Sequence, residues 1–316
     1  MIFYKICIII VEKYKGAIFT ENKNIISAED IKRVKGLGCL QDKRYDDIFN
    51  VRVITGNGKI STEALKIITE AADKFGSGEI AITTRLTTEI QGVKYENIIS
   101  LIDFLNKYGI ETGGTGALVR PVVSCKGTTC QYGLIDTYNL SHKIHERFYK
   151  GYHNTPLPHK FKIAVGGCPN NCVKPDLNDL GIVGQRKIIF DLDQCKGCTL
   201  CQIEKCCPIH IAKVENNLLY VADEACNHCG RCLNKCPFGV TAKYKDGYKI
   251  YIGGRWGKKT AIGKPVNKFF TDENEVMEFI DRVINLFKDE GIKGERFADT
   301  INRLGFENAE YRLLNK

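Results

Sequence analysis

The cysteine spacing constrains this chain more than any other feature of its sequence. Fifteen cysteines occur in 316 residues, whereas a secreted disulfide scaffold is normally much shorter and does not repeat Cys-x2-Cys spacings in this way. The spacing therefore indicates metal binding. Twelve of the cysteines divide into three sets of four, and we expect the remaining Cys7, Cys39 and Cys206 to serve packing.

The most specific of these sets lies near the middle of the chain. The run Cys226-x2-Cys229-x2-Cys232-x3-Cys236 is followed by a proline, and this is the bacterial ferredoxin spacing. Three closely spaced thiolates bind one [4Fe-4S] cluster, and the fourth cysteine binds the neighbouring cluster. A structural zinc site would use only four ligands in two pairs, so zinc is the weaker interpretation.

A similar run begins 31 residues earlier, where Cys195 matches Cys226. Its fourth position is a lysine, and two cysteines follow it. Cys207 precedes a proline and is the better candidate, although Cys206 could replace it if the extra residues bulge differently. By the crossing rule, one cluster is bound by Cys195, Cys198, Cys201 and Cys236, and the other by Cys207, Cys226, Cys229 and Cys232.

The third set flanks a basic stretch and is less specific. Cys125-x4-Cys130 and Cys168-x3-Cys172 form two pairs. On spacing alone they suit a further iron-sulfur cluster or a zinc ion about equally well. The two ferredoxin clusters carry single electrons but bind no substrate, so the chain needs a terminal site elsewhere.

Hydrophobic periodicity predicts alternating strands and helices before the third set. Strand patterns over 49–54 and 79–84 alternate with helical patterns over 63–75 and 96–109. On the first helix, Leu65, Ile68, Ala72 and Phe75 share one face. This order predicts α+β layers rather than a helical bundle. A strand is expected to resume after a turn at Asp246-Gly247, and an amphipathic C-terminal helix over 276–287.

Charge and hydropathy exclude two classes of partner. The net charge is +9, but the sequence has neither a long basic run nor a stacking-aromatic motif, so nucleic acid is not expected. The apolar stretch Ile6–Val11 is far shorter than a membrane span and lacks a cleavage site, so we expect a cytoplasmic protein without a membrane span. The basic excess is either a solvated surface or a site for an anionic ligand.

Five segments together carry a resemblance to a known family. They are TTRLTTEIQG (83–92), GGTGALVRPVVSCKGTTC (113–130), LPHKFKIAVGGCPNNC (157–172), NDLGIVG (178–184) and YIGGRWGKKT (251–260). From about residue 45 to the C terminus the chain resembles the nitrite and sulfite reductase family. The ferredoxin insert and the short length are similar to the anaerobic sulfite reductase C subunit and to small dissimilatory-type relatives.

The resemblance implies a domain division. It predicts α+β architecture, with two-layer α/β units of the nitrite/sulfite reductase type and an inserted ferredoxin domain that holds two [4Fe-4S] clusters. The expected parts are an N-terminal extension (1–44), a ferredoxin-like half-domain (45–120), a siroheme- and cluster-binding domain split into 121–186 and 247–316, and the insert (187–246).

The resemblance also implies a siroheme whose iron is bridged through a cysteine sulfur to a third [4Fe-4S] cluster. Cys125, Cys130, Cys168 and Cys172 match the cluster ligands, and Cys172 matches the bridging one. The first pair departs from the expected spacing, because four residues rather than five separate its cysteines. Arg85 matches a contact to a cofactor carboxylate. The cations that match those around the bound oxyanion are Arg52, Arg120, Lys160 and Lys162.

The chemistry of sulfite suits this basic set. Sulfite is an anion that loses its oxygens as water, which requires fixed positive charge and a supply of protons. Lys160 and Lys162 alternate along a predicted strand, so their side chains emerge on the same face. We therefore expect reduction of sulfite to sulfide by six electrons that pass through the insert.

Alternatives remain at this stage. Nitrite reduction to ammonia would use the same centre, and a chain of this fold without siroheme would be only an electron-transfer subunit. No Rossmann or flavin fingerprint is present, so an electron-donor protein is expected. Larger relatives of the family contain the two-unit body twice, so we expect a homodimer or a pairing with a homologous subunit.

Overall fold

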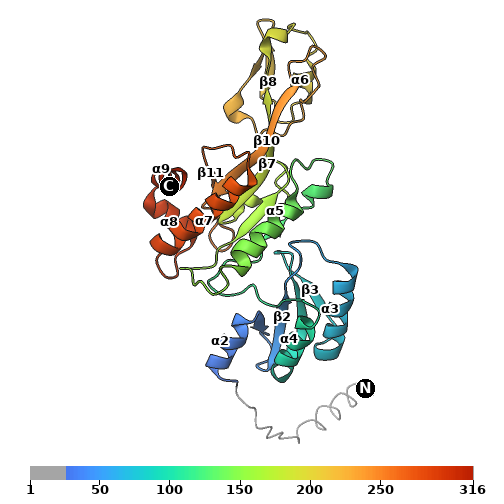
Figure 1. The fold of residues 1–316 in the computed structure, drawn as a ribbon, viewed down its shortest axis with the longest axis vertical. Coiled ribbons are helices and arrows are strands. Elements are labelled where there is room, and N and C mark those ends of the chain that lie inside the picture. Colours follow the sequence, from blue (N-terminus) through green and yellow to red (C-terminus); the bar gives the residue numbers. More distant parts are fainter. Residues whose placement is uncertain (1–25, 316) are drawn as a thin grey trace, which may run out of the picture.

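The structure is a computed structural model that describes residues 26–315. Cys7 and the apolar stretch Ile6–Val11 lie outside these residues. Figure 1 shows three parts in a row along the longest axis: an N-terminal sheet with its helices, a central body, and an insert at the far end. Helices and sheets are mixed in the first two parts, which confirms the predicted α+β class.

The N-terminal part is built on a four-stranded antiparallel sheet of order β1-β2-β4-β3. Every second residue of β2 is buried, so one face of the sheet packs against helices. The strands are β1 (Cys39–Gln41), β2 (Ile48–Val53), β3 (Ile80–Ile82) and β4 (Thr88–Lys94), and the helices are α2 (Ala28–Gly36), α3 (Thr62–Phe75) and α4 (Ile98–Asn106). Cys39 is buried in this core, as expected of a packing cysteine.

The buried face of α3 differs from the predicted one. Ile68 and Ala72 are buried, but Leu65 is 44% exposed. Ala71, which the periodicity had left out, is also buried, so the contact face is centred on the middle of the helix. Leu65 lies in the first turn at the edge of that face and was wrongly assigned to it.

The central body contains a five-stranded mixed sheet of order β11-β10-β7-β6-β5. The strands β5, β6 and β7 are parallel to one another, and β10 pairs antiparallel with β7 and β11. The strands are β5 (Val123–Ser124), β6 (Ile163–Gly166), β7 (Leu180–Ile189), β10 (Lys243–Ile252) and β11 (Lys264–Pro265). The helices are α5 (Thr137–Ile144), which continues as the π-helix η3 (His145–Lys150), α7 (Glu273–Glu290), α8 (Phe297–Leu304) and α9 (Phe306–Leu314).

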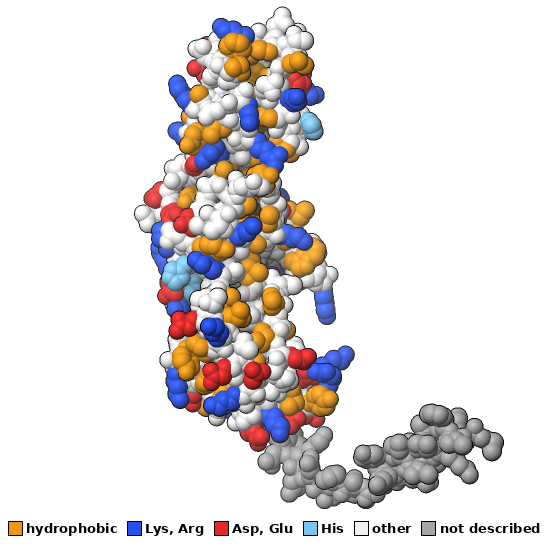
Figure 2. Space-filling view, turned by 90° about the vertical axis from the view of Figure 1, so that its right-hand side faces the viewer, with side chains coloured by type: hydrophobic (Ala, Val, Ile, Leu, Met, Phe, Trp, Pro, Cys, Tyr) orange, Lys and Arg blue, Asp and Glu red, His pale blue; other side chains and the backbone are white. Residues whose placement is uncertain are grey.

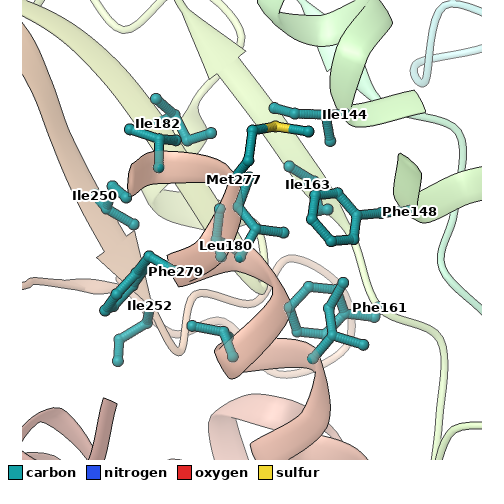
Figure 3. Close-up of a cluster of buried hydrophobic side chains, with 14 of the residues drawn as sticks. Ile144, Phe148, Phe161, Ile163, Leu180, Ile182, Ile250, Ile252, Met277 and Phe279 are labelled. Carbon is teal, nitrogen blue, oxygen red and sulfur yellow. The ribbon is translucent and has the colours of Figure 1, made fainter. Parts of the chain in front are cut away.

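One face of this sheet carries the main hydrophobic core. Figure 3 shows Ile163, Leu180 and Ile250 from three neighbouring strands facing Met277 and Phe279 of α7. These strand residues alternate with small residues such as Ala164 and Gly181, which point to the opposite face. The helices therefore cover one face, and the segment around Pro175 packs against the other, where a Cβ on Gly181 would lie 2.2 Å from the backbone oxygen of Pro175.

The insert is attached to the body by two antiparallel strands that extend beyond it. β7 and β10 are paired over ten residues each, from Leu180 opposite Ile252 to Ile189 opposite Lys243. Residues 190–242 lie beyond this pair (Figure 1). They form α6 (Gln202–Cys206), β8 (Ala212–Glu215) and β9 (Leu218–Val221) around a small core of Ile203, Ala212, Leu219 and Val240.

The turn predicted at Asp246-Gly247 is wrong, because both residues lie within β10. They are paired with Arg186 and Gln185 of β7. A Cβ atom on Gly247 would lie 2.2 Å from the backbone oxygen of Phe270. Glycine is thus required for a close backbone approach rather than for a turn.

The remaining helical elements among the described residues are five single-turn 3-10 helices. They are η1 (Tyr95–Asn97), η2 (Gly127–Thr129), η4 (Pro175–Leu177), η5 (Leu192–Gln194) and η6 (Asp223–Ala225). No helix within residues 26–315 is long and apolar enough to cross a membrane. Figure 2 shows lysine and arginine side chains spread over the visible face, from the insert to the N-terminal part, with acidic side chains between them.

Candidate functional site

Two cysteine loops meet where the parallel strands β5 and β6 end. Cys125 directly follows β5, and Cys168 follows β6 after one glycine. The carboxyl ends of neighbouring parallel strands lie at the same edge of a sheet, so the two loops are adjacent. The backbone N–H of Gly167 donates to Cys125 Sγ at 3.1 Å. Cys130 ends the short helix η2, and Cys172 is exposed.

Two glycines allow these loops to approach closely. A Cβ on Gly167 would lie 2.7 Å from the Cα of Gly127, so no side chain fits between the loops. Burial raises the pKa of the Cys168 thiol, and the neighbouring thiols raise it further. These neighbours are Cys125, Cys172 and Cys130, so the structure brings the four predicted ligands together.

The four cysteines are spread over the two loops and are not gathered at one point. Within residues 26–315, no three His, Cys, Asp or Glu side chains gather closely enough to hold one metal ion. An iron-sulfur cluster is held differently, by four thiolates around a group of irons, with backbone hydrogen bonds to sulfur that tune its potential. The amide of Gly167 makes such a bond to Cys125.

Lys160 and Lys162 lie just before β6, at the opposite end of that strand from the cysteines. Phe161 and Ile163 are fully buried in the core, so the alternating lysines point to the other face. In the described part of the chain, neither ammonium group has a hydrogen bond or an ion pair. Burial lowers the pKa of both lysines, and together with the charge of Arg85 it lowers that of Lys162 to about 8.

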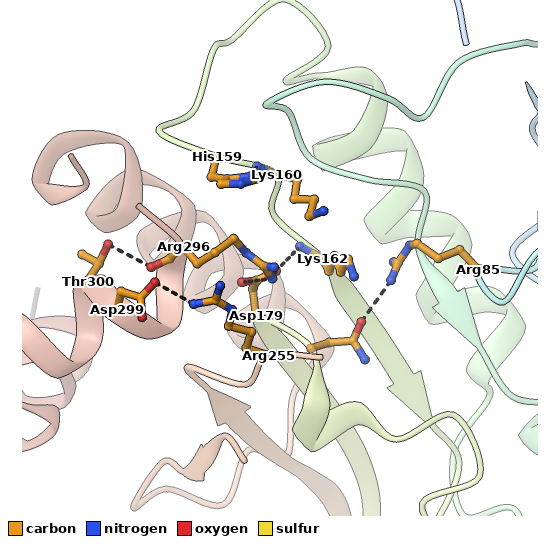
Figure 4. Close-up of polar contacts among 10 residues, drawn as sticks. Arg85, His159, Lys160, Lys162, Asp179, Arg255, Arg296, Asp299 and Thr300 are labelled. Carbon is orange, nitrogen blue, oxygen red and sulfur yellow. Dashed lines mark hydrogen bonds and ion pairs between the residues drawn. The ribbon is translucent and has the colours of Figure 1, made fainter. Parts of the chain in front are cut away.

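Arg85 reaches this region from the turn between β3 and β4. Its guanidinium donates to Asn178 Oδ1 at 3.1 Å (Figure 4). It also donates to the backbone oxygen of Pro121 at 2.7 Å. It thereby joins the N-terminal part to the body. Burial and the charge of Arg120 lower the pKa of Arg85 to about 10.

Arg52 and Arg120 lie on either side of one carbonyl. Both guanidinium groups donate to the backbone oxygen of Gly114. Arg52 is also paired with Glu89, which lies opposite it on β4, at 2.6 Å. Among the predicted cations, Arg52 is therefore the one whose charge is already balanced by a carboxylate in the described structure.

Two further charged residues of the site were not pointed out by the sequence. Asp179 is fully buried and accepts from Arg296 Nη2 through both carboxylate oxygens, each at 3.0 Å. One of these oxygens also accepts the backbone N–H of Lys162 at 2.9 Å. Asp179 stands in the NDLGIVG segment, so a signal existed for it. Arg296 carries none, because it lies in neither a motif nor a hydrophobic pattern.

The unsatisfied donors of this site indicate its ligand. The Nε–H groups of Arg85, Arg120 and Arg296 are buried and have no hydrogen-bond partner among the described residues. Buried polar groups are nearly always paired in native proteins. Burial and neighbouring guanidinium charges lower the pKa of both Arg85 and Arg120. Buried guanidinium groups with free donors suit a ligand with several carboxylates, or an oxyanion.

The insert contains a pocket at its junction with the body. It is lined by Cys207, Cys226, Cys229 and Cys232, which is the set predicted for one ferredoxin cluster. Arg186 and Ile188 of β7 form its wall on the body side. Of the remaining set, Cys195, Cys201 and Cys236 pack against the small core of the insert.

The loop around this pocket is attached to the body. Arg186 N–H donates to the backbone oxygen of His228 at 2.8 Å, and the Gln185 amide donates to that of Asn227 at 3.1 Å. The guanidinium carbon of Arg231 lies 5.3 Å from the ring centre of Tyr132. Tyr132 follows Cys130 by two residues, so this contact links the insert loop that carries Cys229 and Cys232 to the body loop that carries Cys130.

Comparison with known proteins covers nearly the whole described chain. Residues 41–108 match the sequence model of the nitrite/sulfite reductase ferredoxin-like half domain. Residues 115–313 match that of the nitrite and sulphite reductase 4Fe-4S domain.

Named relatives are similar along most of this chain. The coenzyme F420-dependent sulfite reductase of Methanocaldococcus jannaschii is 30% identical over 290 residues, which are 90% of this chain and 45% of that protein. The chain thus spans less than half the length of that relative. The C subunit of the anaerobic sulfite reductase of Salmonella typhimurium is 30% identical over 261 residues, which are 76% of this chain and 74% of that relative.

Solved structures have the same fold. Dissimilatory sulfite reductase I is similar with a TM-score of 0.68 and 20% identity, over 99% of this chain and 86% of that one. The NirA protein of Mycobacterium tuberculosis is similar with a TM-score of 0.64 and 17% identity, over 92% of this chain and 48% of that one.

Proposed function

The chain belongs to the nitrite and sulfite reductase family, and from this premise we propose that it reduces sulfite to sulfide at a siroheme. One observation carries the proposal: the ammonium groups of the two lysines directly before β6 have no hydrogen-bond or ion-pair partner among residues 26–315, and Cys168 and Cys172 follow the end of the same strand. This strand would connect an anion site to a cluster site on the face of the sheet opposite the helices.

The cations divide between cofactor and substrate. Arg85 would hold a siroheme carboxylate, and Cys172, which is exposed, would hold the cluster on the side of the siroheme. Arg120, Lys160, Lys162 and Arg52 would surround sulfite. When bound, siroheme and its cluster would supply the electrons for the reduction one at a time. The lysines hold the oxyanion and donate protons as its oxygens leave as water.

We assign the electron path to the insert. One [4Fe-4S] cluster would be bound by Cys195, Cys198, Cys201 and Cys236, and a second by Cys207, Cys226, Cys229 and Cys232. The second would lie in the pocket against β7 and would precede the body cluster in the path. Leu200, between two ligands of the first cluster, is 83% exposed, so an electron-donor protein would approach there.

The assembly is also part of the proposal. A single copy of the body would need a second copy, or a homologous subunit, to close the siroheme pocket. Several relatives are named as subunits, including the alpha and beta subunits of dissimilatory-type sulfite reductases.

The decisive experiment is anaerobic purification followed by metal, siroheme and turnover measurements. Twelve cluster cysteines predict about twelve cluster irons and one siroheme iron per chain. Sulfite should be turned over faster than nitrite with the same artificial donor. A preparation with about eight irons and no tetrapyrrole would instead indicate an electron-transfer subunit, and faster nitrite turnover would support reduction to ammonia.

A further inference from the structure

Arg296 brings an additional cation into the anion site from a distant part of the chain. It is the N-cap residue of α8, and its side chain is almost fully buried. Figure 4 shows its guanidinium beside Asp179, which is also hydrogen-bonded to Lys162. Its charge lowers the pKa values of His159, Lys160 and Lys162, so it belongs electrostatically to the same site.

Only part of this guanidinium is satisfied within the described chain. Nη2 donates to both oxygens of Asp179 at 3.0 Å, whereas the buried Nε–H has no partner. A buried donor without an acceptor destabilises the protein unless a ligand satisfies it. Asp179 therefore fixes the orientation of Arg296 without using all of its donors.

Asp179 also connects Arg296 to the lysine strand. Its carboxylate accepts the backbone N–H of Lys162, and its own backbone oxygen accepts the N–H of Gly253. The same buried carboxylate thus aligns the guanidinium and the backbone of the strand that carries both ammonium groups. A fixed group of this kind is preorganised for anion binding.

We propose that Arg296 is a further anion-binding residue, whose free Nε–H donates to an oxyanion bound beside Lys160 and Lys162, and that Asp179 is its positioning residue. The oxyanion is either sulfite itself or a carboxylate of the cofactor. The identity of these two ligands rests on the proposed function. The presence of an anion site at Arg296 does not.

The first test compares two arginine-to-lysine variants, one at the N-cap of α8 and one within that helix. Arg296→Lys keeps the charge but removes the planar set of donors. Arg303→Lys is the control, because Arg303 pairs with Glu295 at the surface, away from the lysines. On the anaerobically purified full chain, calorimetry with sodium sulfite gives the dissociation constant, and the absorption spectrum gives siroheme per chain.

We expect Arg296→Lys to differ from the control in one of two ways. If Nε binds sulfite, sulfite affinity falls about ten- to a hundredfold with siroheme content unchanged. If it binds a cofactor carboxylate, siroheme content falls first. Equal sulfite affinity and equal siroheme content in both variants would overturn the proposal.

A second variant separates anion binding from a merely structural role. Asp179→Asn leaves an amide oxygen for Lys162 N–H but removes the charge that balances Arg296. We expect it to bind sulfite or retain siroheme more tightly than wild type, at a lower thermal midpoint. Weaker or unchanged binding of both would overturn the proposal, even if Arg296→Lys does not fold. If wild type lacks siroheme and sulfite turnover, the proposed function fails, but the sulfite calorimetry still tests Arg296.

Discussion

Two adjacent cysteines in the insert have opposite surroundings. Burial raises the pKa of the Cys207 thiol, but backbone N–H groups, led by that of Ile211, lower it below its ordinary value. These N–H groups therefore favour the thiolate form of Cys207. Cys206 Sγ instead donates to the backbone oxygens of Ile203 at 3.4 Å and Arg231 at 3.8 Å, and burial raises its pKa.

We therefore expect Cys207→Ser, but not Cys206→Ser, to remove a cluster. Iron analysis of the purified variants should show a loss of about four irons for Cys207→Ser and no loss for its neighbour. The reverse result would mean that the extra residues before Pro208 bulge differently and that Cys206 is the ligand.

Lys162 should impose a pH limit on turnover. Burial and the charge of Arg85 lower its pKa to about 8, below the ordinary value for lysine. An ammonium donates protons and attracts anions only below its pKa, so kcat/KM for sulfite should fall as pH rises past about 8. In Lys162→Arg the falling limb should move to higher pH, because arginine remains charged. An identical limb in both proteins would assign it to another group.

Residues could be predicted where their signal is local. Spacing predicted the ligands of the insert, because a cluster must be enclosed by a short loop, and strand alternation predicted that Lys160 and Lys162 share one face. Arg296 could not be found in this way. It meets Asp179 across 117 residues of sequence, and only the packing of α8 against the body brings the two together.

At the scale of elements, the close approach of the segment around Phe270 to β10 depends on a single glycine. A Cβ at Gly247 would lie 2.2 Å from Phe270 O, which belongs to a backbone that is bridged to Tyr248. Gly247→Ala should lower stability by about 1–3 kcal/mol, measured as a lower thermal midpoint.

The matched control for this variant is Gly36→Ala in α2. No atom lies within 4 Å of the Cβ that it adds. Alanine is also the better helix former, so the midpoint should stay the same or rise slightly. Equal destabilisation by both substitutions would show that the backbone near Phe270 yields more easily than its contacts suggest.

The same glycine explains why the element boundary was misread. Asp-Gly is a common turn signal, and sequence alone cannot distinguish a glycine needed for a turn from one needed for close packing. Of the elements before residue 110, β2, β3, α3 and α4 were predicted from their hydrophobic patterns, whereas α2, β1 and β4 were not. The pairing of β7 with β10 was not predicted either, since 53 residues separate the two strands.

At the scale of the whole molecule, the insert and the body have separate cores. Ile189 and Lys243 are directly opposite each other, so an Asn-Gly turn could replace residues 190–242 and close β7 and β10 into a hairpin. We expect the shortened chain to fold and to retain about four cluster irons of about twelve. Loss of the folded circular dichroism signal would show that the body needs the insert.

The assembly is open to a similarly direct measurement. We expect light scattering of the holoprotein to give a dimer, because one copy of the body is proposed to complete the siroheme pocket of another. If the chain retains siroheme and full turnover as a monomer, one copy closes its own pocket. If siroheme is retained only after a homologous subunit is added, the partner is that subunit.

The strand pair that carries the insert also restricts how this molecule can change in length. Arg186, Ile188 and Phe190 all line the cysteine pocket because alternate residues of a strand share one face. If one residue were removed from each strand between these side chains and the insert, the insert would be attached with its opposite side facing them. Its pocket would then point away from these side chains. Removing two from each would preserve the facing and shift the insert by about 7 Å. The distance between the proposed cluster site in the insert and that in the body can therefore change only when an even number of residues is added to or removed from each strand.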